Sequence, residues 1–266
     1  PFEPLETRRF SQDEVEAWAE RSRRHFDIGS APVINIREFL AAQGFQVFSV
    51  PLGAERDDLS GLYFQHPELG PVIAVNEDRA YTRRPFTMAH ELAHGLFHYQ
   101  YPVVLCRGGS RDALERFADQ FAAQFLAPTE SLLARLDDMQ VRSVSDPRQV
   151  VHLSRYFGVS YEAMRWRLRA QRKLQDADDP RWKIAPLKMA RQLGFTVSDY
   201  EFGKRPLLLE DRFPRDYLAL ALQGVQDGQL SLRRAAEMLD VSYLELEELM
   251  ENDETALEEE IEEVYV

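Results

Sequence analysis

The residues most able to do chemistry lie between Phe86 and His98, where the sequence reads FTMAHELAHGLFH. His90 and His94 are four residues apart in a run of good helix formers, so both imidazoles can reach one metal ion from the same helix face. Glu91 projects beside such a metal, where its carboxylate can hold a water molecule and take its proton. The motif predicts a hydrolytic metal site, although a core helix whose histidines bond to backbone carbonyls fits the same residues.

A third metal ligand is predicted in the next helix, which begins near Arg111 and ends at Pro128. Its phenylalanine and alanine face marks this helix as buried. A carboxylate early in a buried helix is costly unless it meets a cation, so Glu115 is the expected third ligand. Asp119, one turn later, is expected to orient a ligand imidazole by accepting its other ring N–H. Two solvated acids on an exposed helix edge are the alternative, for Asp119 in particular.

Two further residues near the motif need separate treatment. The helical rise places His98 about 12 Å from His90, whereas zinc–nitrogen bonds measure about 2.0 Å. His98 is therefore expected to be structural or to support a ligand from the second coordination sphere. Cys106 is the only cysteine in the chain and is more simply incidental. As a fourth zinc ligand it would displace the water and hold the site inactive.

Peptide hydrolysis at such a site also needs a donor for the developing oxyanion. Proximity in sequence offers four candidates without a choice among them: Tyr81, Arg84, Tyr99 and Tyr101. Zinc is the expected metal, and Mn²⁺ or Fe²⁺ also suits two histidines and one carboxylate.

The elements around the motif predict an α+β fold. Ser11 heads a capping box, so a helix is expected to about residue 26, and a second is expected over 36–43, before Gly44. Three short strands rich in β-formers, expected to be antiparallel, are predicted near 45–50, 60–65 and 72–75. The 60–65 strand is the expected sheet edge, where an extended peptide can pair.

The rest of the chain is predicted to be helical. We expect a metallopeptidase domain at 1–135, a helix-turn-helix-like extension at 136–175 and a C-terminal helical region at 176–266 that ends in an acidic tail. A second helix-turn-helix pattern occurs at 232–250, residues 170–210 resemble a linker with one short helix, and the last dozen residues are expected to be frayed or disordered.

Charge is distributed unevenly along the chain. Seventeen acidic and four basic residues follow from Glu210 onward, and this segment accounts for the whole net charge of −13. Residues 142–173 carry eight Arg or Lys against two acids. In this basic segment Arg165, Arg167 and Arg169 could approach the phosphates of a nucleic acid. A solvated helix face that pairs with the acidic tail explains the same charges at least as well. The sequence shows no membrane span and no signal peptide, and a single cysteine favours the cytoplasm.

Two sequence blocks resemble a known peptidase family. HExxH followed about twenty residues later by ExxxD is similar to the thermolysin-like zinc peptidases, in which two histidines and one glutamate hold zinc. The sequence around these motifs resembles the ImmA/IrrE family of bacterial metallo-endopeptidases over roughly residues 10 to 170. The resemblance is carried by RPFTMAHELAH at 84–94 and ERFADQFAAQFLAP at 115–128. The sequence departs from the usual family pattern at Pro85, at Ala93 and over 125–127. None of these departures removes a chemical group that catalysis needs.

The resemblance implies a regulatory zinc endopeptidase with a narrow substrate. Relatives commonly cut a cognate Xre-type repressor or an antitoxin and so relieve transcriptional repression, in stress or DNA-damage responses or in mobile elements. The competing hypothesis is a regulatory protein- or DNA-binding module whose metal site is structural or vestigial. An intact Glu91 argues against that alternative, because a structural zinc needs a fourth protein ligand and no general base.

Overall fold

The computed structural model describes residues 2–5, 8–53, 59–101, 103–107, 112–203 and 207–250. The chain forms two compact units, Pro1–Pro206 and Leu207–Val266. A sheet and several helices share the first unit, and the described part of the second is helical, so the predicted α+β fold is confirmed. The predicted divisions at residues 135 and 175 fall inside the first unit and stay a prediction.

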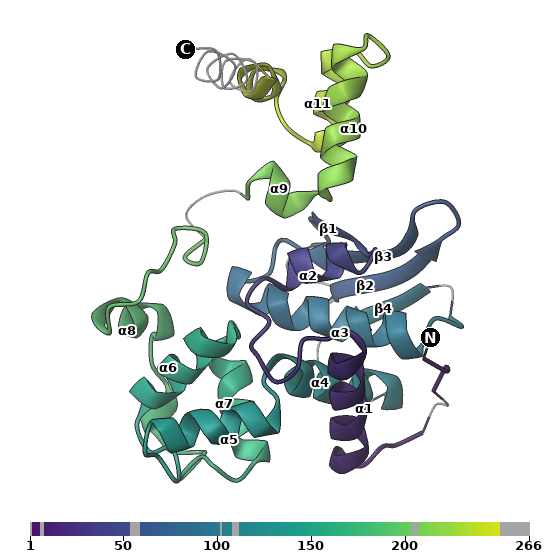
Figure 1. The fold of residues 1–266 in the computed structure, drawn as a ribbon. Helices are drawn as coiled ribbons and strands as arrows, with labels where there is room; N and C mark the ends of the chain where they lie inside the picture. The colour runs from purple at the N-terminus through teal and green to yellow at the C-terminus, as the bar shows by residue number, and fades with distance from the viewer. Residues whose placement is uncertain are drawn as a thin grey trace, which may run out of the picture. The chain divides into compact units, whose positions relative to one another are not determined.

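Figure 1 shows how the elements are arranged within each unit. The first unit contains α1 (Gln12–His25), α2 (Ile36–Ala42), β1 (Gln46–Val50), β2 (Leu59–His66), β3 (Gly70–Asn76), η1 (Tyr81–Arg83), α3 (Arg84–Phe97), β4 (Val103–Arg107), α4 (Ala113–Leu126), α5 (Thr129–Asp138), α6 (Pro147–Phe157), α7 (Tyr161–Ala170), η2 (Pro180–Trp182) and α8 (Pro186–Gln192). The second contains α9 (Leu209–Arg212), α10 (Arg215–Gln226) and α11 (Leu232–Leu239), and residues 243–250 are also helical.

The sheet differs from the prediction in strand number, direction and edge. Its described strands lie in the order β1-β3-β2-β4, with β1 parallel to β3 and the other two pairs antiparallel. β4 is a strand that the sequence analysis did not predict. The expectation that the 60–65 strand is an edge is wrong, because β4 returns from beyond the HExxH helix to pair with β2. The edge strands are β1 and β4.

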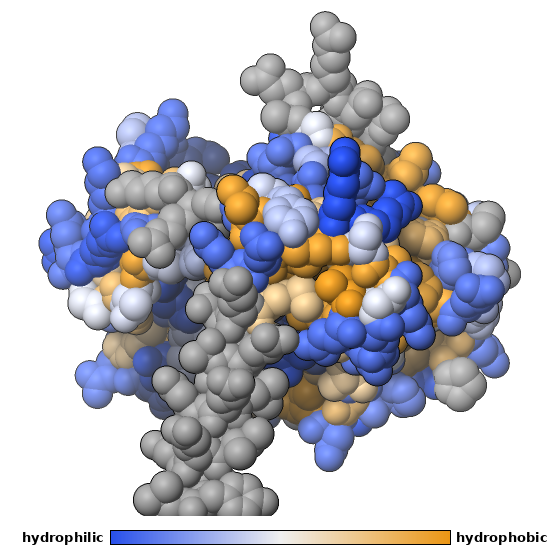
Figure 2. All heavy atoms as spheres, turned by 90° about the horizontal axis from the view of Figure 1, so that it is seen from above, coloured by the Kyte–Doolittle hydropathy of each residue, from blue (hydrophilic) through white to orange (hydrophobic). Residues whose placement is uncertain are grey.

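The two faces of the sheet have different surroundings. Tyr63, Ile73 and Val75 are buried in the core, on the face against which α3 packs. On the opposite face the register places Leu105 beside Leu62, and both Leu105 and Val103 are more than half exposed. Figure 2 shows that hydrophobic residues gather over a broad area of the surface seen from above.

The first hydrophobic core joins α1, the sheet, α3 and α4. Asp112 caps the start of α4 by accepting from the backbone N–H of Leu114 at 2.8 Å. Phe117, Phe121 and Phe125 then follow at helical spacing, and all three rings are buried. Because this aromatic stripe packs against α3, it fixes which residues of the two helices face each other.

A second core lies further along the chain, in α5 to α8 and the segment that follows. Residues 170–210 were expected to be a linker, and this expectation is wrong for most of the segment. Trp182, Ala190 and Val197 are buried in the second core, and the indole N–H of Trp182 donates to the Asp176 carbonyl at 2.9 Å. The apolar side chains of this segment, its one tryptophan among them, are therefore ordered by packing into the second core.

The predicted helix-turn-helix pattern corresponds to α6 and α7. Gly158 ends α6 with a left-handed φ of 65°, and Ser160 caps α7. The three arginines of α7 have different environments. Arg167 is buried and donates to the Ala127 carbonyl and the Gln124 side chain, so its guanidinium is not available to phosphate. Arg165 pairs with Glu162, and Arg169 pairs with Asp178.

The second helix-turn-helix pattern comprises α11 and helical residues 243–250, joined at Asp240, whose φ is 50°. The acidic residues of the last dozen positions lie outside the described part of the chain. Among the helices that are described, none combines the length and the hydrophobicity needed to cross a membrane.

Candidate metal centre

The HExxH residues occupy the middle of α3. Pro85 lies in the first turn, where its missing N–H removes no helical hydrogen bond, so its presence before Phe86 does not interrupt the helix. His90 and His94 are both buried on the side of α3 that faces α4. Their Nε2 atoms approach to 3.2 Å, as expected for an i, i+4 pair directed at one point.

Glu115 brings a carboxylate from α4 to the same point. Its Oε2 lies 3.4 Å from His90 Nε2, and its Oε1 lies 3.5 Å from His94 Nε2. Tetrahedral coordination with bonds of about 2.0–2.1 Å separates ligand atoms by about 3.3–3.4 Å. The three predicted ligands therefore converge at about the spacing of zinc ligands, and with Cys106 they form a group among the described residues that could hold a metal ion.

The hydrogen bonds of the Nδ1 atoms of His90 and His94 decide which protons their Nε2 atoms carry. His90 Nδ1 lies 2.9 Å from Asp119 Oδ1, and a carboxylate accepts, so this nitrogen carries the proton. His94 Nδ1 lies 2.8 Å from His98 Nδ1 and donates to it when Nε2 of His94 is a ligand. Both Nε2 atoms then present lone pairs to each other at 3.2 Å, an arrangement that a bound cation would stabilise.

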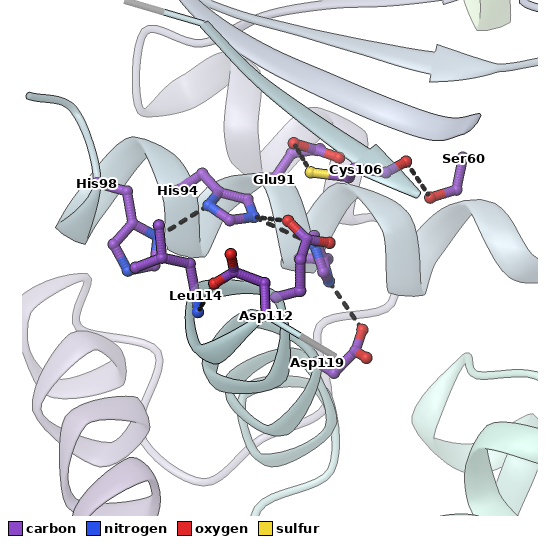
Figure 3. Close-up of polar contacts among 10 residues, drawn as sticks. Ser60, Glu91, His94, His98, Cys106, Asp112, Leu114 and Asp119 are labelled. Carbon is purple, nitrogen blue, oxygen red and sulfur yellow. Dashed lines mark hydrogen bonds and ion pairs between the residues drawn. The ribbon is translucent and has the colours of Figure 1, made fainter. Parts of the chain in front are cut away.

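Figure 3 shows these contacts as a chain across the two helices. Asp119 approaches from α4, where the sequence predicted a supporting acid. His98 lies one turn beyond His94 and is fully buried against Phe117. Burial and the neighbouring His94 lower the pKa of His98 to about 3, so it is neutral and can accept a hydrogen bond. Its own Nε2 has no partner among the described residues.

Removing the Asp119 carboxylate should weaken metal binding without removing a ligand. Asp119→Ala is expected to lower zinc affinity roughly 10–100-fold, the usual effect of losing a partner that orients a ligand histidine. Competition with a chromophoric chelator measures the change. Asp137→Ala, which removes an exposed acid from α5, is the matched control. Equal zinc affinity in the Asp119 and Asp137 variants would show that His90 needs no such support.

The electrostatics of the metal-free site also indicate a position for positive charge. Burial disfavours a charge on His90, but hydrogen bonds to Asp119 and Glu115 outweigh it and raise its pKa to about 10. For Glu115, burial is outweighed by hydrogen bonds from both histidines, which lower its pKa to about 2. Without a metal the cluster therefore holds a proton on His90, and a divalent cation would replace that proton.

Glu91 projects from α3 toward the sheet. It is fully buried, and one carboxylate oxygen, Oε2, accepts from the Cys106 thiol at 3.2 Å. Its Oε1 has no hydrogen-bond partner among the described residues. Burial raises the pKa of Glu91 to about 8 in the metal-free site. A nearby divalent cation would favour the carboxylate, the form that can accept a proton.

The space around Glu91 depends on a glycine that sequence reasoning missed. A Cβ at Gly61 on β2 would lie 2.7 Å from Glu91 Oε1 and 3.0 Å from the Ala74 carbonyl oxygen. The available signal was a glycine inside an otherwise β-forming run, which often marks a close approach of another group. In the sheet Gly61 on β2 pairs with Cys106 on β4, and the register between the two strands is irregular between Leu59 and Gly61. At this irregularity the Ser60 hydroxyl donates to the Cys106 carbonyl at 3.2 Å.

The four oxyanion candidates do not line the cavity at the site. Tyr99 donates to the Phe2 carbonyl at 3.2 Å, and Tyr101 follows it beyond the end of α3. Arg84 is buried, donates to the Glu77 carbonyl and lies over the Tyr81 ring. None of the four belongs to the described lining of the cavity, so this prediction gains no support from the geometry.

A cavity of about 700 Å³ opens onto His90, Glu115 and Asp119. One wall comes from the metal-site region, including Thr82 and Phe86. The other comes from the second core and its helices, including Val151, Tyr161, Trp166 and Leu187. Sequence reasoning did not find this cavity, because its two walls are separated in the chain and meet only in the folded first unit.

Comparison with known proteins gives one family match. Residues 40–169 match the family model described as the IrrE N-terminal-like domain, a peptidase family. No curated protein matches the chain. The matched segment contains all of the metal-centre residues, from the HExxH helix through Glu115 and Asp119. Residues 40–169 therefore match an IrrE N-terminal-like peptidase domain, in agreement with the resemblance to the ImmA/IrrE family.

Proposed function

We propose that this protein is a zinc-dependent endopeptidase that hydrolyses a peptide bond in one specific regulatory protein. The observation that carries the proposal is the arrangement of Glu91 beside three convergent ligands, His90, His94 and Glu115. A structural zinc site has no use for a buried carboxylate of this kind. Zinc is the metal proposed, and Mn²⁺ and Fe²⁺ are alternatives that metal analysis of the purified protein distinguishes.

The chain's own residues divide the reaction between binding and proton transfer. When bound, the metal supplies a Lewis acid that polarises the scissile carbonyl and activates water. Glu91 takes the proton from the attacking water at a carboxylate oxygen and then passes it to the nitrogen of the leaving amine. Asp119 and His98 keep the two ligand imidazoles in the required tautomer and orientation.

The substrate has two surfaces available near this site. β4 is an edge strand, so an extended peptide can pair with its free backbone groups. The cavity beside His90 offers aromatic and aliphatic side chains, including Phe86, Val151, Trp166 and Leu187. These surfaces favour an extended segment with an apolar side chain near the cleaved bond.

Adding a methyl group at Gly61 should interfere with the proposed base. In Gly61→Ala the new Cβ must displace Glu91 or the sheet backbone, so we expect kcat/KM to fall roughly 10–100-fold and the free energy of unfolding to fall by about 1–3 kcal/mol. Gly95→Ala is the control, because its Cβ would meet the Phe45 ring and not Glu91. Cleavage assays on folded fractions, with denaturant titrations, compare the two. If both variants lose activity only in proportion to stability, Gly61 does not position Glu91.

The substrate we propose is an Xre-type transcriptional repressor or an antitoxin, so that cleavage relieves repression in a stress response. Support for this class comes from the family resemblance. The test incubates the purified protein with the Xre-type protein encoded beside it, with zinc and with a chelator, and identifies fragments by mass spectrometry. Zinc-dependent cleavage at one bond, absent with the Glu91→Gln variant, is the expected result. An uncut repressor would reject this substrate, and salt-dependent duplex binding unaffected by Glu91→Gln would favour the binding-module alternative.

A further inference from the structure

Cys106 occupies a position that the proposed reaction does not use. It is the single cysteine of the chain, lies in β4 and is 1% exposed. Figure 3 shows its sulfur directed at Glu91, between the sheet and α3. One ligand atom from each of His90, His94, Glu115 and Cys106 can be chosen so that all four lie within 4.8 Å of one another.

This separation is close to what a four-ligand zinc site needs. Zinc–sulfur bonds of about 2.3 Å and zinc–nitrogen bonds of about 2.0 Å separate sulfur from a neighbouring ligand atom by about 3.5 Å in a tetrahedron. The His90 and His94 Nε2 atoms lie 3.2 Å apart, and each lies 3.4–3.5 Å from one of the two Glu115 carboxylate oxygens. No pair of the four donor atoms is more than 4.8 Å apart, so a side-chain rotation of Cys106 can bring its sulfur to the metal.

We infer that Cys106 is a fourth, displaceable zinc ligand that holds a latent form of the enzyme. Ligation breaks the S–H bond, forms a zinc–sulfur bond and releases the thiol proton to solvent. The latent form is blocked because the sulfur fills the position that water needs. The regulatory half of this inference rests on the proposed peptidase function, whereas the ligand assignment does not.

The strand that carries the thiol also suggests how it is released. Cys106 points inward from β4, the edge strand with which an extended substrate can pair. The register of β4 against β2 is irregular at this point, and such bulges allow a strand to shift locally. Pairing of the substrate backbone with β4 would move the strand and withdraw the sulfur from the metal.

Metal spectroscopy tests the ligand assignment without reference to activity. The full-length protein is loaded with zinc for X-ray absorption and, separately, with Co²⁺ for electronic absorption. We expect a sulfur scatterer at about 2.3 Å from zinc and a thiolate-to-cobalt charge-transfer band. The band should disappear in Cys106→Ala and Cys106→Ser and persist in Leu105→Ala, which alters the neighbouring residue of the same strand. A zinc site without sulfur in the unmodified protein, measurable even if the variants do not fold, would overturn the inference.

Cleavage assays then test latency. Cys106→Ala and Cys106→Ser should raise basal cleavage roughly tenfold, the ratio given by a preference of about 1.4 kcal/mol for the thiolate-bound form. Unchanged cleavage in both variants would overturn the latent form. The outcomes also separate the two proposals. Sulfur at the metal, with no cleavage even by Cys106→Ala and Cys106→Ser, would reject the peptidase and keep the ligand, whereas cleavage without sulfur would do the reverse.

Discussion

Glu91→Gln is expected to lower kcat/KM for the protein substrate by roughly 10²–10⁴-fold, the usual contribution of a general base, while zinc content stays unchanged. The amide has the size of the carboxyl group but cannot accept the proton of the attacking water. The Glu115 carboxylate contacts the Nε2 atoms of His90 and His94, and Asp119 contacts Nδ1 on the opposite edge of the His90 ring. Neither carboxylate can therefore take over the role of Glu91 as the general base.

The loss should not be explained by unfolding. Burial raises the pKa of Glu91 to about 8 in the metal-free protein, so glutamine resembles the protonated acid that the fold already contains at neutral pH. Parallel measurements of zinc by plasma emission, of thermal unfolding and of cleavage separate the effects. Glu130→Gln, which neutralises an exposed acid on α5, is the control for charge. A zinc-bound Glu91→Gln protein with full activity would remove Glu91 from the mechanism.

Glu115→Gln is expected to abolish stable zinc binding, with an affinity loss greater than about 100-fold, the upper end of what losing an orienting partner costs. The neutral amide is a weak ligand, and it also leaves the facing His90 and His94 nitrogens without their shared counter-charge. Zinc at 1,000 times its dissociation constant should raise the free energy of unfolding of the unmodified protein by about 4 kcal/mol, and this gain should nearly vanish in the variant.

Thermal unfolding with increasing zinc measures this difference, and Asp119→Ala supplies an intermediate case. The expected order of zinc stabilisation is unmodified protein, then Asp119→Ala, then Glu115→Gln. Retention of zinc by Glu115→Gln at the original affinity would show that Glu115 is not required. The third protein ligand would then be sought at Cys106, the other donor in the cluster.

Much of the metal centre could be predicted from the sequence because its parts are local. The spacing of His90 and His94 specifies one helix face whatever surrounds the helix, and the buried aromatic face of α4 makes Glu115 costly without a cation. His98 could be excluded as a ligand by helical rise alone. Its contact with His94 Nδ1 follows from the same periodicity, as one more turn of α3.

The features that were missed all depend on pairing between distant segments. The alternation of apolar and polar residues in a strand does not specify which strands pair with it. The 60–65 strand, β2, was therefore predicted to be the sheet edge, whereas β4 pairs with it after the chain has passed through α3. The same pairing places Cys106 on the buried side of a strand. The requirement for glycine at position 61 likewise arises only because β2 packs against α3, which brings Gly61 next to Glu91.

The sequence by itself therefore predicted a metal-binding group, the helices that carry it and the general α+β class, since these follow from short-range periodicity and side-chain type. The tertiary structure alone decided which strand lies at the edge, how closely the Cys106 sulfur approaches the metal ligands and where the cavity lies. Those properties arise from contacts between residues far apart in the chain, and contacts of that kind are selected by the packing of the whole unit, not by any one segment.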